Sequence, residues 1–334
     1  MRLLKLSPAS SHIPPRSVIA HDARDPREAS RVLARKGNLL SSAEVSDLFA
    51  RGVQDLHLLV PDEGDLTEDE AATRLAEIVA GPGVTCSETH YGQVNFTSSR
   101  RGLFRIDDRA VDDINGQQGV LLFTAEPDRP VDPGAALGGV KCAPLLLGQH
   151  VVESVRAIGH AVEVVPFQPT RVAFVAPRAR LRGSAFDQAH ASLSSSLAWY
   201  GSTLDVVPDT EPTIEGVARA FGAAAQQEVG LILAAGASAT DPADLLFDGL
   251  RAAGGEVLQI GVPAEPGTAC WIARLDDIPV LGLASCELFG KPGALDLLLP
   301  RILSGQPLTR RLVRGLGRGG LVVGGPERLA PYHS

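Results

Sequence analysis

Apolar and polar positions follow a regular alternation along the second half of the chain. Residues 171–177 (RVAFVAP) form a short, β-branched apolar run ending at proline, which predicts a buried strand. Residues 184–200 then repeat apolar positions with helical spacing up to Gly201, which predicts a helix. The alternation continues with strands expected at 203–209, 229–236 and 256–262 and helices at 213–227 and 241–255. It predicts an α/β fold, with a three-layer, mainly parallel sheet and helices on both faces.

The last part of this region departs from the alternation. Residues 269–275 and 278–284 are two apolar runs joined by a pair of aspartates, which predicts a hairpin. Residues 291–303 have the apolar spacing of a closing helix. Because a proline-flanked stretch, PFQPTR, precedes the regular pattern, we place an N-terminal domain at 1–168 and the α/β domain at 169–325.

The first half of the chain has a mixed pattern. Two capping boxes, each satisfying two backbone amides at a helix start, predict two helices. They are Ser41 with Glu44 and Thr67 with Glu70, for helices at 42–51 and 68–80. Residues 84–145 are richer in glycine, proline and short β-like runs. The N-terminal domain is therefore expected to be mixed α+β and rich in β-structure.

The composition of the chain argues against several classes of protein. The chain has 334 residues, of which 44% are hydrophobic, so it can bury a sizeable core and is not disordered. A net charge of -8 and an aromatic content of 4% argue against nucleic acid as a partner. No apolar run approaches a membrane span, and the apolar stretch at the start is too short for a signal peptide, so we expect a cytoplasmic protein. Four separated cysteines indicate neither a zinc knuckle nor a disulfide framework.

Three loops of the predicted sheet are candidates for ligand binding. In an open parallel sheet the ligand crevice lies beyond the carboxyl ends of the strands. The loops that qualify are 235–244 (AGASATDPAD), 262–269 (VPAEPGTA) and 283–293 (LASCELFGKPG). We expect all three to lie at one edge of the sheet, because each follows a strand running in the same direction.

The first of these loops supports two interpretations. Backbone amides from Gly236 to Ser238 can approach a phosphate closely, and Asp241 or Asp244 can hold a magnesium ion beside it. The same residues are also suited to starting a helix, with Asp241 as the N-cap and Asp244 in the first turn. Capping does not exclude phosphate binding, since the same amides serve both roles.

The remaining motifs give weaker evidence about function. The letters GLGRGG at 315–320 match GxGxxG, but neither a strand before them nor a helix after them is predicted, so we interpret the match as accidental and expect no nicotinamide cofactor. Cys286 is either a nucleophile activated by a helix N-terminus or a small buried group. Four nearby arginines face either an anionic ligand or solvent: Arg310, Arg311, Arg314 and Arg318.

Taken in order, the three loops resemble those of the molybdopterin-binding fold of molybdopterin adenylyltransferases, molybdopterin molybdotransferases and gephyrin. That family has a GGxSxGxxD-like loop after the third strand, a PGKP-like turn before a hairpin and an LPGNP-like turn after it. The corresponding stretches here read AGASATDPAD, EPGTA and LASCE. RGLFRID, VDDIN and VKCAP in the first half are similar to a divergent bacterial subgroup of molybdopterin-binding proteins, sometimes fused to a nucleotidyltransferase domain.

The chain also departs from the family pattern. The first glycine of the first loop is Ala235, and the lysine and proline of the PGKP-like turn are Thr268 and Ala269. Ala284 and Ser285 replace the proline and glycine of the last turn. A loop that loses glycine loses close backbone approach to a ligand.

The resemblance implies a set of site residues and a ligand. Asp241 is implied as the catalytic residue and as the residue that positions magnesium. The implied cofactor-binding positions are Gly236, Ser238, Asp244, Pro266, Gly267, Ser285 and Lys291. The implied ligand is molybdopterin or the molybdenum cofactor.

Three functions follow as hypotheses. The first is molybdotransferase-like chemistry in cofactor biosynthesis, maturation or delivery, and the second is a non-catalytic cofactor carrier or scaffold for molybdoenzyme assembly. The third is a generic nucleotide-binding α/β protein. Besides the pterin ligand, the resemblance implies a molybdoenzyme or a nucleotidyltransferase as partner and a homodimer as the assembly.

Overall fold

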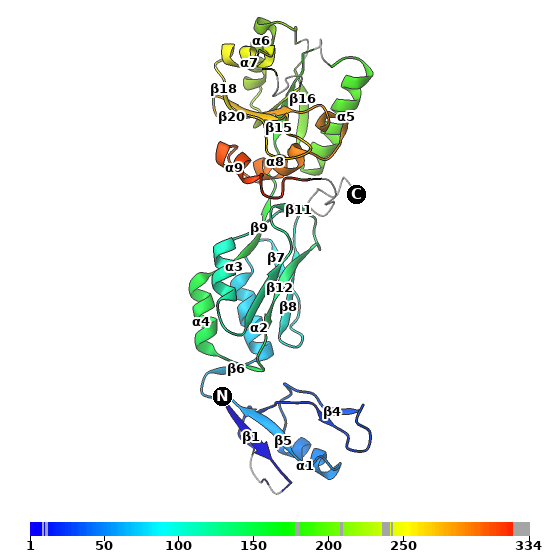
Figure 1. The fold of residues 1–334 in the computed structure, drawn as a ribbon, viewed down its shortest axis with the longest axis vertical. Helices are drawn as coiled ribbons and strands as arrows, with labels where there is room; N and C mark the ends of the chain where they lie inside the picture. Colours follow the sequence, from blue (N-terminus) through cyan, green and yellow to red (C-terminus); the bar gives the residue numbers. More distant parts are fainter. Residues whose placement is uncertain are drawn as a thin grey trace. The chain divides into compact units, whose positions relative to one another are not determined.

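The chain forms two compact units, which are described separately (Figure 1). In this computed structural model the described residues are 1–8, 10, 13–177, 181–207, 210–235, 241 and 243–322. The first unit comprises Met1–Ser99, Arg105–Pro127 and Pro133–Val164, and the second comprises Arg100–Phe104, Asp128–Asp132 and Val165–Ser334. Residues 100–104 and 128–132, which precede the boundary expected at residue 169, thus belong to the second unit.

The first unit contains several small antiparallel sheets. Its strands are β1 (Arg2–Leu6), β2 (Val18–Ile19), β3 (Ala23–Arg24), β4 (Val32–Ala34), β5 (Leu56–Val60), β6 (Asp65–Thr67), β7 (Val84–Cys86), β8 (Gln93–Ser98), β10 (Val120–Thr124), β12 (Ala136–Cys142) and β13 (Leu146–Gly148). Its helices are α1 (Ser42–Ala50), α2 (Glu68–Val79), α3 (Asp108–Asn115) and α4 (Gln149–Ile158). The sheet orders are β1-β5-β2, β3-β4, β13-β6 and β10-β12-β8-β7. A further sheet has the order β11-β9-β14, formed by Arg129–Val131, Gly102–Ile106 and Val162–Pro166; β11 and the first three residues of β9 are assigned to the second unit.

Both predicted capping boxes are present. Ser41 Oγ accepts the Glu44 N–H at 3.2 Å, and Glu44 Oε2 accepts the Ser41 N–H at 2.8 Å. Thr67 and Glu70 make the same pair of hydrogen bonds at the start of α2. These reciprocal bonds satisfy amides that have no partner inside the helix, so the sequence signal placed both helix starts correctly.

The second unit is built on a six-stranded mixed sheet. Its order is β16-β15-β17-β20-β19-β18. The strands are β15 (Arg171–Val175), β16 (Thr203–Val206), β17 (Leu231–Ala235), β18 (Glu256–Ile260), β19 (Trp271–Leu275) and β20 (Ile278–Leu283). The first four strands of this order pair in parallel, whereas β19 is antiparallel to both β20 and β18. β18 is antiparallel to β19, which is itself antiparallel to β20. β18 therefore runs in the same direction as β20 and β17.

The α/β class is confirmed, but the sheet is less parallel than expected. The predicted hairpin, β19 and β20, is inserted beside β18 and makes that end of the sheet antiparallel. The strand pairs of the first unit are antiparallel as well, so antiparallel pairing predominates over the described chain. The short turn at Asp276, with φ +51°, allows β19 to fold back directly onto β20.

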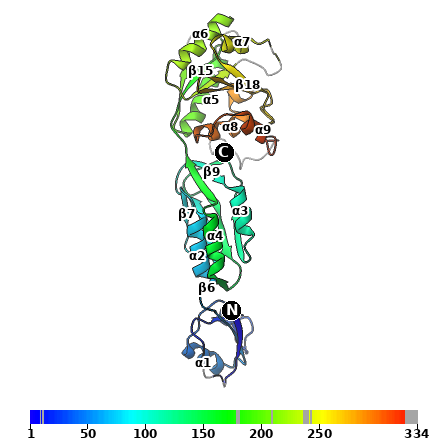
Figure 2. The same ribbon diagram turned by 90° about the vertical axis from the view of Figure 1, so that its left-hand side faces the viewer.

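Two apolar cores lie on opposite sides of this sheet. Val172 and Phe174 of β15 belong to one core, together with residues of α5 (Ser184–Trp199) and α8 (Ala294–Leu303). The intervening Ala173 and Val175 belong to the other, with residues of α6 (Ile214–Ala225) and α7 (Leu245–Ala252). Figure 2 shows α6 and α7 on one side of β15 and β18, with α5 and α8 on the other. Since successive side chains of a strand point to opposite faces, a continuous apolar run is buried on both.

The start of α7 corrects one expectation. Asp244, not Asp241, is the N-cap, and its Oδ1 accepts the Leu246 N–H at 3.0 Å. Asp241 Oδ1 instead accepts the Ala243 N–H at 3.1 Å, which closes a short turn before the helix. The helix therefore begins one turn later than the sequence pattern suggested.

The glycine-rich stretch GLGRGG lies in a loop, as expected. It begins at the last residue of α9 (Arg310–Gly315), residues 316–319 form turns and bends, and Gly320 has no regular structure. A helix rather than a strand precedes it, so the arrangement required for dinucleotide binding is missing from this described stretch. None of the helices in the described part of the chain is long and apolar enough to cross a membrane.

Replacing Asp244 with alanine should lower the free energy of unfolding by about 1 kcal/mol, because α7 loses its N-cap acceptor. The matched change Asp241→Ala should cost less than about 0.5 kcal/mol, since Asp241 is exposed and lies outside the helix. Urea denaturation followed by circular dichroism measures both. An equal or larger loss for Asp241→Ala would contradict the assignment of the cap.

Candidate functional site

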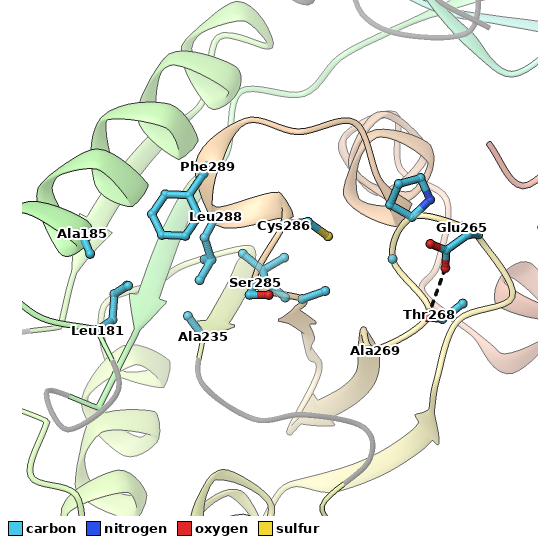
Figure 3. A pocket seen from close by; sticks show the side chains of 14 residues that line it. Leu181, Ala185, Ala235, Glu265, Thr268, Ala269, Ser285, Cys286, Leu288 and Phe289 are labelled. Atoms are coloured by element: carbon cyan, nitrogen blue, oxygen red, sulfur yellow. Dashed lines mark hydrogen bonds between the residues drawn. The ribbon is translucent and has the colours of Figure 1, made fainter. Parts of the chain in front are cut away.

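A pocket of about 630 Å³ lies at the edge of the second unit's sheet where β17, β18 and β20 end (Figure 3). Because these three strands run in the same direction, the segments that follow them meet at one edge. The lining residues are Leu181, Ala185, Ala235, Glu265, Pro266, Gly267, Thr268, Ala269, Leu283, Ala284, Ser285, Cys286, Leu288 and Phe289. A volume of this size is typical of small-molecule sites.

The pocket has an apolar side and a polar side. Figure 3 shows Leu181 and Phe289 toward one end and Glu265 toward the other, with Ser285 and Cys286 between them. Thr268 Oγ1 donates to Glu265 Oε2 at 3.4 Å. Glu265 is exposed and is the single charged residue among the described lining residues. The pocket therefore combines apolar walls with one negatively charged acceptor.

Close backbone packing shapes the loop after β18. The Glu265–Pro266 peptide is cis, and Gly267 has φ +119°. A Cβ at Gly267 would lie 2.5 Å from the backbone nitrogen and the Cβ of Ala294, at the start of α8. Only glycine both adopts this conformation readily and leaves room for the helix. The first turn of α8 is thus packed against the wall of the pocket.

A buried glutamate holds the pocket segments together. Glu287 lies in the one-turn 3-10 helix η1 (Glu287–Phe289), and its side chain is 2% exposed. Its Oε1 accepts the Leu295 N–H of α8 at 2.8 Å. Its Oε2 accepts the Ala284 N–H at 3.2 Å and lies 2.7 Å from the donor Cys270 Sγ. One carboxyl group therefore connects the end of β20, the start of α8 and the residue before β19.

Burial controls the ionisation of this cluster. It raises the pKa of Glu287 above its ordinary value, although the hydrogen bonds from Cys270, Leu295 and Ala284 oppose the shift. Burial is also the main cause of the raised pKa of Cys270, to which the nearby Glu287 adds. Cys286 has a raised pKa for the same two reasons, in the same order. This direction does not match the interpretation of Cys286 as a nucleophile, which requires a lowered thiol pKa.

The pocket brings together some of the expected ligand residues. Pro266, Gly267 and Ser285 line it, from two of the three predicted loops. Ala235, the residue at which the first loop begins, lines it too. Lys291 is exposed in the segment before α8 and is not among the lining residues. The assignment of these residues to cofactor binding stays a prediction.

The remaining expected residues belong to the first loop. Gly236 and Ser238 lie outside the described residues. Asp244 is buried at the N-cap of α7, and Asp241 is exposed. Within the described ranges no group of three histidine, cysteine, aspartate or glutamate residues is placed to hold a metal ion. Asp241 Oδ1 accepts a hydrogen bond within its own turn, and the assignment of Asp241 to catalysis and to magnesium binding stays a prediction.

Sequence reasoning missed several residues of the site. Glu265 precedes Pro266 directly, and a charged residue beside the expected PGKP-like turn was a usable signal. Leu181 precedes α5, Ala185 lies in its first turn and Phe289 lies in η1. All three reach the pocket only through tertiary packing. Glu287 lies in the letters SCELFG, where the local sequence gives no indication of burial.

Comparison with known proteins gives limited information. No protein-family model matches the chain, and no curated protein matches it. Among solved structures, the chain is similar to the molybdopterin biosynthesis MoeA protein from Pyrococcus horikosii, with 14% sequence identity and a TM-score of 0.31. The match covers 76% of this chain and 81% of that chain.

Replacing Glu287 with alanine should destabilise the second unit by about 1–3 kcal/mol, the cost of a buried N–H left without a partner. The Leu295 N–H loses its acceptor in Glu287→Ala, whereas the Ala284 N–H keeps a weaker acceptor, Cys270 Sγ at 3.3 Å. Glu265→Ala, a change of the same kind at an exposed position of the pocket, should cost less than about 0.5 kcal/mol. Urea denaturation of both variants tests this, and similar losses would contradict the anchoring role.

The raised pKa of Glu287 also predicts a pH dependence. Folding favours the protonated acid, so this group's contribution to stability is complete below its ordinary pKa of 4.5 and is lost as the pH rises through the folded-state pKa. Glu287→Gln does not titrate and removes this dependence. The free energy of unfolding of the unmodified protein should therefore fall relative to that of Glu287→Gln as the pH is raised from about 4 to about 8. A relative gain would show that the carboxylate form is the one favoured by folding.

Proposed function

We propose that this protein binds molybdopterin or the molybdenum cofactor in the pocket at the ends of β17, β18 and β20, and acts in biosynthesis, maturation or delivery of that cofactor. The supporting observation is that two of the three segments resembling the family's ligand loops line one pocket, and that the third begins at its edge. The arrangement of helices on both faces of the sheet is consistent with the molybdopterin-binding fold that the sequence resembles.

The chemistry of the pocket suits a flat heterocycle. Leu181, Leu288 and Phe289 provide apolar walls for the ring faces. A pterin carries N–H donors along its aminopyrimidinone edge, and the carboxylate of Glu265 is an acceptor for two such donors. No cation is among the described lining residues, so the phosphate of the ligand is assigned to the backbone amides of Gly236 to Ser238, as the resemblance implies.

Two roles remain for a protein that binds this ligand. A molybdotransferase-like enzyme would transfer metal to the dithiolene, whereas a carrier would deliver the finished cofactor to a molybdoenzyme. Thr268 and Ala269 stand where the family pattern has lysine and proline, which favours the carrier as the second candidate. Magnesium binding by Asp241 stays a prediction, and this proposal does not depend on it.

A pocket-filling substitution tests the proposal. Ser285 is exposed at the pocket, so Ser285→Trp should fill it without disturbing the core and should weaken molybdopterin binding at least about tenfold. The matched control, Ser195→Trp on the exposed side of α5, should bind as the unmodified protein does. Calorimetric titration with molybdopterin released from a molybdoenzyme measures both.

Equal binding by the two tryptophan variants, or no binding by the unmodified protein, would refute the proposal. A nucleotide that binds the same pocket more tightly than molybdopterin would favour a nucleotide-binding protein instead. Turnover of adenylated molybdopterin with molybdate separates the enzyme from the carrier.

A further inference from the structure

A second pocket, of about 550 Å³, lies within the first unit and has a different character. It is lined by Met1, Ala20, Asp22, Arg35, Lys36, Leu59, Glu68, Tyr91, Lys141, Ala143, Pro144 and Leu145. These residues come from the β3–β4 region, the start of α2, the turn before β8 and the end of β12. The pocket is separate from the one assigned to the pterin ligand.

Three cationic side chains line this pocket without a carboxylate partner. Arg35, Lys36 and Lys141 are all lining residues, and across the described part of the chain none of them makes an ion pair within 4.0 Å. Lys5, in the same unit, does pair with Asp55. Cations on a protein surface commonly find such partners, so three unpaired ones around one hollow are available to bind an anion.

Lys141 is held in place by the pocket wall. Its Nζ donates to the Tyr91 carbonyl oxygen at 2.8 Å, which leaves two of its three N–H groups available to a ligand. The Tyr91 ring lies 4.1 Å from the His90 ring and 5.9 Å from the Arg35 guanidinium, measured to the centroid. The adjacent Gly92 donates its N–H to Asp69 Oδ1 at 2.7 Å, which fixes the turn.

The acidic residues of the pocket do not neutralise it. Glu68 is half-buried, and burial raises its pKa, as does the neighbouring Asp69, which is not a lining residue. Lys141 and Lys36 act in the opposite direction. Asp22 Oδ1 accepts the backbone N–H of Lys36 at 3.0 Å. Even with both acids ionised, the three cations leave a net charge of +1 among these side chains, and protonation of Glu68 increases it.

We propose that this pocket is a binding site for a small phosphate-bearing molecule. Two lysines and an arginine around a hollow match a compact anion with several acceptor oxygens. The volume is larger than inorganic phosphate requires, so the ligand carries an organic group as well. The proposal does not depend on the function assigned to the second unit.

Calorimetric titration of the full chain with inorganic pyrophosphate tests the proposal. The unmodified protein should bind it, and Lys141→Gln should weaken binding about tenfold or more, the usual consequence of losing one charge-assisted contact. Lys5→Gln is the matched control and should leave the affinity unchanged. Lys36→Gln, at an exposed position, replaces Lys141→Gln if the latter does not fold.

A second measurement uses the fact that the chain has four lysines: Lys5, Lys36, Lys141 and Lys291. Pyridoxal 5′-phosphate forms an imine with a lysine amine, and borohydride reduces the imine to a stable amine that mass spectrometry locates. We expect label on Lys36 and Lys141 ahead of the other two lysines, and protection of both by pyrophosphate.

Absence of pyrophosphate binding, unchanged affinity in Lys141→Gln, or equal labelling of all four lysines would overturn the proposal. Citrate binding as tightly as pyrophosphate would assign the site to carboxylates instead.

Discussion

The pocket of the second unit depends on the buried carboxyl group of Glu287. Two backbone amides and one thiol, from three separate segments, point at its two oxygens. Burying a carboxyl group is costly unless hydrogen-bond partners are present. Glu287 can therefore be buried only where these three segments meet. The raised pKa of Glu287 shows that desolvation outweighs the three hydrogen bonds. The site is therefore organised by a group that gains little from being ionised.

Two glycines make this convergence possible. A Cβ at Gly293 would lie 2.7 Å from Glu287 Oε1, and one at Gly267 would meet the backbone of Ala294. Glycine at position 293 lets the start of α8 lie against the carboxyl group of Glu287. Glycine at position 267 lets the pocket loop lie against the first turn of α8. These two glycines therefore keep close backbone approach in the loops around the pocket.

The sequence predicted those features that depend on local interactions. Ser41 and Thr67 specify their helices through side chains three positions away, and the apolar runs of β15 and β17 are sufficient to identify buried strands. The N-cap of α7 was misplaced because Asp241 and Asp244 are both good caps, and only the turn closed by Asp241 decides between them. Arg35 and Lys141 lie far along the chain from Tyr91, which both contact, and Glu287 bonds to Cys270 as well as to residues nearer in sequence. Their roles are set by tertiary packing, which no local pattern records.

The two pockets differ in the charge of the side chains that line them, so the binding proposed for each should respond differently to salt. Among the described residues, the pocket of the second unit has apolar walls and one carboxylate, so burial of a ring and short-range hydrogen bonds dominate there. The pocket of the first unit has three cations, two of them exposed, whose attraction for an anion is screened over about 8 Å at physiological ionic strength. Raising the salt concentration should therefore weaken the proposed anion binding in the first unit more than the proposed ring binding in the second unit. Affinities measured at two ionic strengths distinguish the sites without any substitution in the chain.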